Sequence, residues 1–516
     1  MEIELGLPEQ FNAADYFVDR NVREGRGEKV AILCEDRSLT YGQVQAGMNR
    51  IGNSLKALSI RMEERVALLL LDTEVYPQAF FGAIKIGAVP ICLNTLMRPK
   101  DYRYFLNDSR ARVLIVDAAL LDVLDPVRKE LRFLEHIVVV NGPAPEWAMG
   151  FERFAADSSS ELEPAPTGPD DSCFWLYSSG STGAPKGAIH LQHDMVYCVE
   201  TYGKQVLGVR ENDICFSAAK LFFAYGLGNG LYFPFSVGAT AVYMPARPTP
   251  ASVYETIHRH RPTLFFGVPT LYAAMLQAEG GGLESVRLCV SAGEALPADI
   301  LRRWLERHHV QIADGIGSTE IAHIFISNSA DSIKPGSSGK VVPGYEAKIV
   351  DENFQEVPVG EIGTLLIKGD SICAGYWNKH QKTKSTFLGQ WINTDDKYHR
   401  DEEGFYYYVG RANDMLKVGG IWVSPVEVEA CLIAHPAVFE CAVVGATDKD
   451  DLVKPKAFIV LKPGYSPDAA MEEELKGYVK KQLAHYKFPR WIVFIDELPK
   501  TATGKVKRFE LRKAPE

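Results

Sequence analysis

Tyr177-Ser-Ser-Gly-Ser-Thr-Gly-Ala-Pro-Lys-Gly187 is the stretch that says most about how this chain folds and what it binds. Serine, threonine and glycine fill most of its positions, and a lysine follows them. Such a loop turns backbone N–H groups and hydroxyls toward one anion, and glycine lets the backbone come close to it. The stretch therefore predicts polyphosphate binding. A Walker A loop has Ser or Thr after its lysine, whereas Gly187 follows Lys186, so another class of nucleotide chemistry is predicted.

The sequence around this loop alternates helical and strand patterns. Thr40 is placed to cap a helix with apolar residues on one face, and Val66–Leu71 is a short apolar run typical of a buried parallel strand. The strand pattern of Cys173–Leu176 leads into the loop, and Gln192–Tyr202 resembles a helix after it. Alternation of this kind predicts α/β layers with largely parallel sheets.

The pattern changes toward the C-terminus. After about Asp351, glycine, proline and turn residues become dense, with short strands such as Thr364–Lys368, which predicts a β subdomain. From Gly410 onward, helices and strands are compact enough for a core of roughly one hundred residues. We therefore predict a large α/β N-terminal domain of parallel-rich sheets flanked by helices, with a β subdomain, and a small α+β C-terminal domain.

Composition narrows the class of protein. The chain has 516 residues, more than one core normally holds, and a formal net charge of −10, which disfavours nonspecific nucleic-acid binding. The nine cysteines include no Cys-x-x-Cys pair and are interpreted as buried thiols of a reducing compartment. The acidic N-terminus does not resemble a secretory signal, and the apolar runs are too short to span a bilayer. We predict a cytoplasmic protein without nucleic-acid or membrane partners.

Four further segments carry residues suited to nucleotide chemistry. Gly293-Glu294-Ala295 follows a predicted strand, and Asp314-Gly-Ile-Gly-Ser-Thr-Glu320 follows another, where open α/β sheets place their ligands. The Thr319 hydroxyl and the Glu320 carboxylate suit a phosphate oxygen and its Mg²⁺. Trp391–Asp396 offers a carboxylate for a ribose, and Pro499–Lys505 is a Gly/Thr-rich segment that ends in a lysine. Each is weak alone, since turns, helix starts and solvated charges have the same composition.

In sequence and in order, these segments together resemble the adenylate-forming superfamily of acyl-CoA synthetases, luciferases and peptide-synthetase adenylation domains, over roughly residues 30–508. The resemblance implies an N-terminal adenylation domain at 1–412, a mobile C-terminal domain at 413–516, and ATP, Mg²⁺ and coenzyme A as ligands. It implies that the phosphates of ATP are held by Ser178, Ser179, Gly180, Ser181, Thr182, Gly183 and Lys186.

The resemblance also assigns roles to residues outside the phosphate loop. Thr319 would contact the α-phosphate, Glu320 and Thr182 would bind Mg²⁺, and Lys505 would act at the α-phosphate with Lys186, Thr182 and Glu320 as the other catalytic residues. Asp396 and Arg411 would hold the ribose, while adenine would lie against Gly293, Glu294, Ala295, Asp314, Gly315 and Ile316. Rotation of the C-terminal domain would then replace Lys505 by the segment that contains Lys417, Gly419 and Gly420, which leaves room for a pantetheine arm.

Two positions depart from the superfamily pattern. Where the family usually has Thr-Gly-Asp, this chain has Thr394-Asp395-Asp396, so an extra carboxylate stands beside the ribose residues. It either weakens nucleotide binding or points to solvent. The family's hinge acid is replaced by Asn413, which tolerates unusual backbone angles almost as well as aspartate. We therefore place the hinge at Asn413.

The identity of the acid depends on Lys220-Leu-Phe-Phe-Ala-Tyr-Gly-Leu-Gly-Asn229. Aromatic side chains followed by glycines suit a flat slot for a planar ring, although a buried structural segment has a similar composition. The segment resembles the benzoate–CoA and hydroxybenzoate–CoA ligase branch. It offers no obvious buried acid or amide for a ring substituent, which favours benzoate. The predicted acyl pocket comprises Phe223, Ala224, Tyr225, Gly226, Val268, Gly317, His323 and Ile324.

Several alternatives remain open at this point. Hydroxybenzoate, aminobenzoate or an alicyclic ring acid would fit a similar slot. An enzyme that loads its acyl group onto a carrier protein, or a noncatalytic nucleotide sensor, would share part of the pattern. The sequence is compatible with a monomer or a homodimer.

Overall fold

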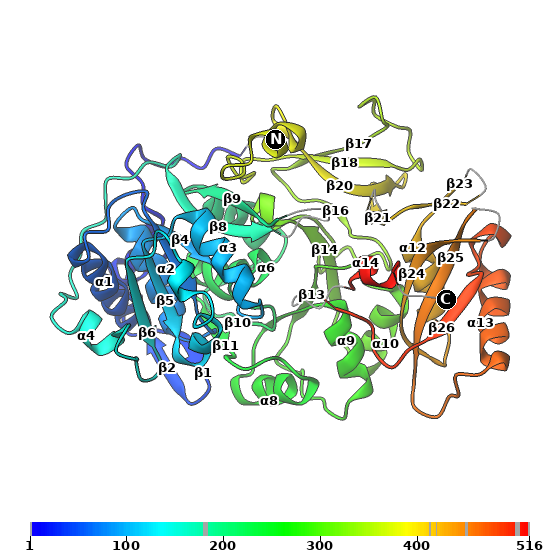
Figure 1. The fold of residues 1–516 in the computed structure, drawn as a ribbon, viewed down its shortest axis with the longest axis horizontal. Coiled ribbons are helices and arrows are strands. Elements are labelled where there is room, and N and C mark those ends of the chain that lie inside the picture. The colour runs from blue at the N-terminus through cyan, green and yellow to red at the C-terminus, as the bar shows by residue number, and fades with distance from the viewer. Residues whose placement is uncertain are drawn as a thin grey trace.

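The fold was analysed in a computed structural model that describes residues 3–178, 184–411, 414–418, 421–448, 452–500 and 506–513. Two large sheets form the N-terminal part (Figure 1). The first has the order β7-β6-β5-β3-β4-β8-β9 and is parallel except for its last pair, β8 and β9. Its strands are β3 (Arg65–Leu69), β4 (Val89–Cys92), β5 (Val113–Asp117), β6 (His136–Val140), β7 (Met149–Gly150), β8 (Ser172–Ser178) and β9 (Lys186–Leu191).

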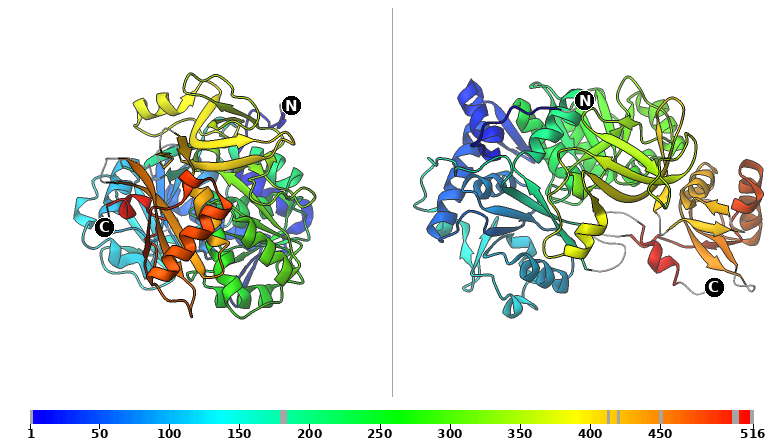
Figure 2. Two further views of the ribbon diagram at one scale, coloured as in Figure 1. Left: turned by 90° about the vertical axis from the view of Figure 1, so that its right-hand side faces the viewer. Right: turned by 90° about the horizontal axis from the view of Figure 1, so that it is seen from above.

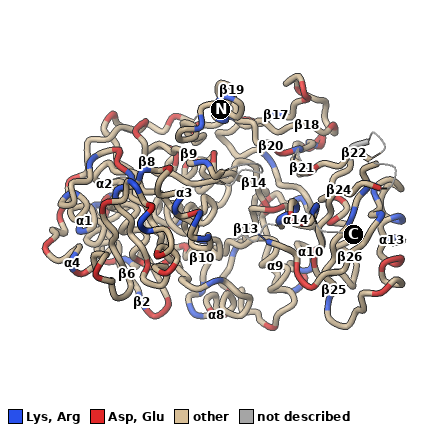
Figure 3. The backbone as a smooth tube through the Cα atoms, viewed as in Figure 1, with Lys and Arg blue, Asp and Glu red and all other residues tan. Residues whose placement is uncertain are grey.

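The second large sheet has the order β16-β15-β14-β13-β12-β10-β11-β1-β2, with parallel strands from β14 to β1. Strands β12 and β13 carry no charged residue, as expected of strands covered on both faces, and β13 is drawn without charged residues in Figure 3. The strands are β1 (Val30–Cys34), β2 (Arg37–Thr40), β10 (Ile214–Ser217), β11 (Thr240–Tyr243), β12 (Leu264–Gly267), β13 (Leu288–Ser291), β14 (Ile312–Gly317), β15 (Ile324–Ser327) and β16 (Lys340–Val341).

Helices cover these sheets (Figure 2). The cap predicted at Thr40 is present: its side chain accepts a hydrogen bond from the Gln43 N–H, and Gln43 reciprocates. The helices are α1 (Tyr41–Ala57), α2 (Val75–Lys85), α3 (Pro99–Ser109), α4 (Phe151–Ala155), α5 (Asp194–Cys198), α6 (Ala224–Leu227), α7 (Phe233–Val237), α8 (Pro250–His260), α9 (Pro269–Gln277) and α10 (Ala298–His308), with 3₁₀ turns η3 (Ala118–Val123), η4 (Arg128–Glu130) and η7 (Thr319–Ile321).

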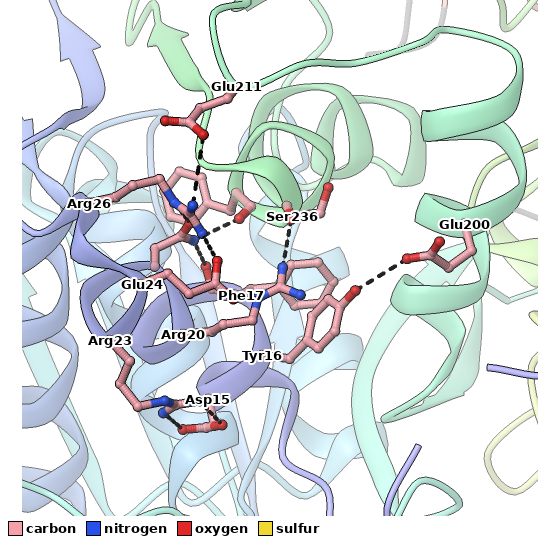
Figure 4. Close-up of polar contacts among 12 residues, drawn as sticks. Asp15, Tyr16, Phe17, Arg20, Arg23, Glu24, Arg26, Glu200, Glu211 and Ser236 are labelled. Atoms are coloured by element: carbon pink, nitrogen blue, oxygen red, sulfur yellow. Dashed lines mark hydrogen bonds and ion pairs between the residues drawn. The ribbon is translucent and has the colours of Figure 1, made fainter. Parts of the chain in front are cut away.

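Several π-helical turns were not predicted from the sequence. They are η1 (Asp15–Asp19), η2 (Val22–Arg26), η5 (Val199–Gly203) and η6 (Gly228–Tyr232). Figure 4 shows how the first two are fastened: Arg20 lies over the Tyr16 ring and donates to the Ser236 carbonyl at 2.6 Å, while the Tyr16 hydroxyl donates to Glu200 at 3.3 Å. The N-terminal segment is thereby tied to α7, which directly follows η6.

The predicted β subdomain is an antiparallel sheet of order β17-β18-β20-β19, with β21 paired to β20. Its strand β18 matches the strand predicted at Thr364–Lys368 to within one residue. The Trp391–Asp396 segment lies inside a strand and not in a loop. The elements are β17 (Glu346–Val350), β18 (Gly363–Lys368), β19 (Phe387–Leu388), β20 (Trp391–Arg400), β21 (Tyr406–Arg411) and the helix α11 (His380–Thr386).

The C-terminal part lies at one end of the molecule and forms its own apolar clusters (Figures 1 and 2). Three strands pair in the order β24-β25-β26, and β22 pairs with β23. The elements are β22 (Leu416–Val418), β23 (Ile421–Val423), α12 (Pro425–Ile433), β24 (Val438–Thr447), β25 (Val453–Leu461), α13 (Ala469–Gln482), η8 (His485–Lys487), β26 (Trp491–Phe494) and α14 (Arg508–Leu511).

The predicted fold class is confirmed: parallel-rich sheets flanked by helices, a β subdomain and a small α+β unit at the C-terminus. The boundary between 412 and 413 falls on residues outside the described ranges and stays a prediction. Among the described helices, none combines the length and apolar character needed to cross a membrane.

Candidate active site

The phosphate loop connects two antiparallel strands. Strand β8 ends at Ser178 and β9 begins at Lys186, and these two residues are partners in the register of the pair. The sequence predicted a strand, the loop and then a helix near Gln192–Tyr202. The predicted helix is present as α5 and η5, and the structure adds the strand β9 between loop and helix, which the sequence did not predict. The strand register places Ser178 and Lys186 side by side at the end of β8 and the start of β9.

Glu320 joins this hairpin from the second sheet. It lies in the turn η7, and its Oε1 accepts hydrogen bonds from the Ser178 hydroxyl and the Tyr376 hydroxyl, both at 2.9 Å. Its backbone carbonyl accepts from the Cys373 N–H at 2.8 Å. Residues that are more than one hundred positions apart in sequence therefore meet at one carboxylate.

Lys186 completes the cluster. Its ammonium group lies 4.6 Å from the centre of the Tyr376 ring, a cation–π geometry. Burial lowers the pKa of Lys186, and the nearby Glu320 carboxylate opposes that shift. Three predicted site residues, Ser178, Lys186 and Glu320, are thus brought together around a tyrosine that the sequence did not single out.

Thr319 is held by a second group that sequence reasoning missed. His190 Nε2 lies 2.8 Å from the Thr319 carbonyl oxygen, and His190 Nδ1 lies 2.7 Å from Asp194 Oδ2, with both side chains fully buried. A carbonyl only accepts, so Nε2 carries a proton, and the carboxylate fixes the ring. The signal in the sequence was a histidine four residues before an aspartate at the start of a helix.

The predicted ribose residues form an ion pair. Asp396 and Arg411 are register partners on β20 and β21, and Arg411 Nε lies 2.9 Å from Asp396 Oδ1. Arg411 also donates to the Thr394 carbonyl at 3.0 Å. The buried Asp396 carboxylate is therefore held in place beside a half-exposed guanidinium.

The backbone conformation of Asp395 shows why the family pattern has glycine at this position. Its φ is +58°, the left-handed conformation that glycine adopts without strain and that aspartate tolerates better than most residues. Its side chain is 56% exposed and lies 3.6 Å from the Lys382 ammonium. The extra carboxylate thus lies in solvent beside a surface lysine, and its effect on nucleotide binding stays a prediction.

The predicted adenine segments meet at Asp314. Gly293, Glu294 and Ala295 form the loop after β13, where Gly293 has φ +95°. The Leu296 N–H, at the end of that loop, donates to Asp314 Oδ2 at 3.3 Å. Asp314 is buried in β14, and Gly315 follows it where a side chain would lie only 2.9 Å from the Ile326 carbonyl. Ile316 is the next residue of the same strand.

Burial raises the pKa of Asp314 to about 8, which makes stability depend on pH. The unfolded chain ionises this group near 3.9, whereas the folded protein retains the proton, so stability is lost as pH rises from about 4 to about 8. We expect Asp314→Asn to remove this loss. Relative to the variant, the wild type should lose roughly 1 kcal/mol per pH unit between pH 5 and pH 8. Urea unfolding of both proteins measures it, and parallel pH profiles would contradict it.

The predicted acyl segment begins at Phe223, which precedes α6, and continues into the π-turn η6. The Tyr225 hydroxyl donates to the Val290 carbonyl at 3.0 Å and lies 3.2 Å from the Gly267 carbonyl. Only glycine fits at position 226, because a Cβ there would lie 2.0 Å from the Lys220 carbonyl oxygen. Ala224, the first residue of α6, stays partly exposed beside them.

His323 packs against this segment. Its ring centre lies 5.7 Å from that of Tyr225, and its Nε2 lies 3.3 Å from the Tyr225 carbonyl. Burial lowers the pKa of His323 to about 3, so the ring is neutral at physiological pH. Gly317 pairs with Ile324 next to it. Val268 lies at the start of α9, close to Gly293, which places it between the adenine and acyl segments.

Some predicted site residues lie outside the described ranges, and for Lys417 this concerns the side chain only. They are Ser179, Gly180, Ser181, Thr182, Gly183, Asn413, Lys417, Gly419, Gly420 and Lys505.

The described residues fit a magnesium ion that is bound mainly by phosphates. Mg²⁺ usually takes one or two carboxylates, with substrate phosphates and waters as its other ligands. Glu320 is such a carboxylate, and its Oε1 already receives two hydroxyl donors. Within the described ranges there is no cluster of three or more metal-ligating side chains that would suit a metal held by protein alone. Glu320 would hold Mg²⁺, which would offset the charge of the phosphates.

Candidate nucleotide-binding segments beside parallel strands, on this fold, are typical of an adenylate-forming enzyme, and comparison with known proteins agrees. A model of the AMP-binding enzyme family matches residues 18–377, and one of the AMP-binding enzyme C-terminal domain matches residues 427–505. The chain therefore belongs to the AMP-binding enzyme family, which confirms the predicted membership.

Individual relatives cover nearly the whole chain. A benzoate–CoA ligase of Thauera aromatica is 52% identical over 99% of this chain and 97% of its own length. The structure of an anthranilate CoA ligase in complex with anthranoyl-AMP has a TM-score of 0.95 and 46% identity, covering 99% of this chain and 98% of that one. A benzoate CoA ligase from Burkholderia xenovorans LB400 has a TM-score of 0.91 and 46% identity, covering 98% and 100%.

Proposed function

We propose that this protein is an AMP-forming aryl-CoA ligase that prefers benzoate. The 52% identity to a benzoate–CoA ligase over the full chain carries this proposal. The acyl segment supports it, because the Tyr225 hydroxyl already donates to a backbone carbonyl and is not free to donate to a ring substituent. An unpaired substituent buried there would cost roughly 1–3 kcal/mol.

The reaction has two balanced steps. A carboxylate oxygen attacks the α-phosphorus of ATP, the bond to the β-phosphate oxygen breaks, and pyrophosphate leaves. The CoA thiolate then attacks the acyl carbon, and AMP leaves. Two anions meet in the first step, so their repulsion must be offset by cations. We assign Lys186 and the loop at 178–183 to the departing phosphates, Thr319 and Lys505 to the α-phosphate, and Glu320 with Thr182 to Mg²⁺.

The remaining assignments follow the same geometry. Gly293–Ala295 and Asp314–Ile316, joined by the Leu296–Asp314 hydrogen bond, would contact adenine. The Asp396–Arg411 pair would bind the ribose hydroxyls. The segment 417–420 would admit the pantetheine arm in the second step. The acyl group would lie among Phe223, Ala224, Tyr225, Gly226, Val268, Gly317, His323 and Ile324.

We further propose two domains, 1–412 and 413–516, that pivot at Asn413. The apolar clusters of the C-terminal part contain only residues from 416 onward, which supports two separate cores. Among the described residues, the interactions that cross the boundary include the Ser424 hydroxyl donating to the Val409 carbonyl. All nine cysteines are free thiols, which supports a reducing cytoplasm. The protein is a monomer or a homodimer, and light scattering would distinguish the two.

A second acid is favoured by one observation. His323 Nδ1 is buried and makes no hydrogen bond to any described residue. A ring substituent with a hydrogen-bond donor would satisfy it, and the anthranilate ligase with a TM-score of 0.95 takes an acid that carries an amino group. Aminobenzoate is therefore the second candidate for the substrate.

A substrate panel tests the proposal. AMP release is measured with CoA and with benzoate, 2-aminobenzoate, hydroxybenzoates or cyclohexane carboxylate, ranked by kcat/KM. Benzoate should rank first, and CoA alone should suffice as the acceptor. A first rank for 2-aminobenzoate would select the second candidate. AMP release only in the presence of a carrier protein would replace CoA by that acceptor, and no release with any acid would favour a nucleotide sensor.

Ala224 allows the acyl pocket to be tested separately from the nucleotide site. We expect Ala224→Val to lower kcat/KM for benzoate about 10–100-fold, because two extra methyl carbons enter a slot sized for a flat ring. The KM for ATP should stay unchanged, since Ala224 is assigned to the acyl pocket and the phosphates of ATP to residues around Ser178 and Glu320. Initial rates at saturating CoA measure both. An effect confined to ATP would move Ala224 out of the acyl pocket.

A further inference from the structure

Tyr376 lies between the two charged groups of the phosphate site. Its hydroxyl donates to Glu320 Oε1 at 2.9 Å, and the Lys186 ammonium lies over its ring, 4.6 Å from the ring centre. The side chain is 6% exposed. One residue thus contacts both the carboxylate assigned to Mg²⁺ and the lysine assigned to the departing phosphates.

The backbone of Tyr376 is fixed against the phosphate hairpin. The Ala374 N–H donates to the Ile189 carbonyl at 2.9 Å, the Ile189 N–H to the Gly375 carbonyl at 3.0 Å, and the Trp377 N–H to the Gly187 carbonyl at 2.9 Å. The segment 374–377 therefore runs along β9 as an extra edge. The backbone of Tyr376 is therefore positioned by β9, the strand that begins at Lys186.

Tyr376 is also held by residues outside the β8–β9 hairpin. The Tyr376 N–H donates to the Thr383 hydroxyl at 3.1 Å, and the ring packs edge-on against Phe387 at 5.4 Å between centres. The neighbouring Cys373 N–H holds the Glu320 carbonyl. Both ends of the Tyr376–Glu320 hydrogen bond are thus held by backbone contacts.

In the hydrogen bond between Tyr376 and Glu320, the donor and the acceptor are defined by their chemistry. A carboxylate oxygen only accepts, so the Tyr376 phenol is the donor to Glu320 Oε1. With the Ser178 hydroxyl it occupies Oε1 of Glu320. In the described part of the chain Oε2 makes no hydrogen bond, which leaves that oxygen for a cation.

We propose that Tyr376 is a positioning residue of the ATP site: its hydroxyl orients Glu320 toward Mg²⁺, and its ring face holds Lys186 toward the phosphates. This inference rests on the proposed function and adds to it a residue outside the phosphate loop. The two contacts use different parts of the side chain, so two substitutions separate them. Tyr376→Phe removes the hydroxyl and keeps the ring, and Tyr376→Leu removes both.

Calorimetric titration of ATP tests this inference without catalysis, once with excess Mg²⁺ and once with EDTA. For Tyr376→Phe we expect the affinity for Mg·ATP to fall about tenfold, the range for a lost hydrogen bond to a charged group, while Mg-free ATP binds as in the wild type. For Tyr376→Leu the affinity for both forms should fall. Melting temperatures without nucleotide show that each variant is folded.

A matched control removes a phenol–carboxylate hydrogen bond elsewhere. Tyr16 donates to Glu200 in the N-terminal segment (Figure 4), and Tyr16→Phe should leave both affinities unchanged. Equal losses with and without Mg²⁺ in Tyr376→Phe, or no loss in either variant, would overturn the positioning role. Because Tyr376→Phe preserves the ring, it decides the matter even if Tyr376→Leu is unfolded. A wild type that binds no ATP would overturn the proposed function as well.

Discussion

Lys505→Ala should lower the rate of adenylation by at least about 10²–10³-fold and leave the thioester step from supplied benzoyl-adenylate largely intact. The loss is expected because the other lysine of the site, Lys186, is assigned to different phosphates. Lys186 lies over Tyr376, and we assign it to the departing phosphates, whereas we assign Lys505 to the α-phosphate. Removal of Lys505 leaves the charge that develops there without a cation. Pyrophosphate exchange measures the first step, and thioester formation with CoA measures the second.

The reverse variant gives the control. Gly420→Leu should block the thioester step, because a side chain would fill the path of the pantetheine arm, and exchange should survive. Loss of both steps in Lys505→Ala would contradict its assignment to adenylation alone. Loss of exchange in Gly420→Leu would remove that residue from the thiol path.

Much of the fold could be predicted because parallel strands that are covered on both faces have distinctive sequences. The run predicted at Val66–Leu71 overlaps β3 (Arg65–Leu69) in all but its first residue, and the cap at Thr40 was found. The hairpin of β8 and β9 was missed because Gly187 interrupts the strand pattern of Lys186–Leu191. The π-turns η1 and η6 were missed because one extra residue per turn leaves helical periodicity almost unchanged over five residues.

The candidate site shows a similar division. Ser178, Lys186 and Glu320 were predicted from local composition and family resemblance. Tyr376 and His190 were not, because their roles depend on contacts with residues more than fifty positions away: Glu320 for Tyr376, and Thr319 for His190. A tyrosine or histidine in such a segment has no local feature that distinguishes it from a core residue. Only tertiary structure shows which carboxylate or carbonyl it meets.

The buried pair of Lys85 and Asp19 was equally invisible to sequence patterns. Lys85 Nζ lies 2.7 Å from Asp19 Oδ2 and 2.7 Å from Asn49 Oδ1, and Gln45 donates to Asp19 Oδ1 at 2.7 Å. The Lys85 side chain is 2% exposed. These contacts join α2, η1 and α1, so the N-terminal segment of Figure 4 is tied to the helices of the first sheet.

We expect Lys85→Met to lower the free energy of unfolding by about 3–5 kcal/mol, because Asp19 is left buried without its counter-charge. Burial already raises the pKa of Asp19, with Lys85 opposing the shift, so loss of Lys85 should raise that pKa further. A raised folded-state pKa costs stability progressively as pH rises above the unfolded value near 3.9. The destabilisation should therefore be larger at pH 8 than at pH 5, as measured by urea unfolding at both.

The double variant Lys85→Met/Asp19→Asn separates the stranded charge from the lost contact. Asparagine keeps the shape of Asp19 and still accepts from Gln45, so the double variant should be more stable at pH 8 than Lys85→Met alone and should lose the additional pH dependence. Replacing both members of a buried pair by uncharged groups is often nearly neutral, whereas removing one is costly. Additive losses from the two substitutions would show that Asp19 is not a stranded charge in Lys85→Met and that the pair acts through packing alone.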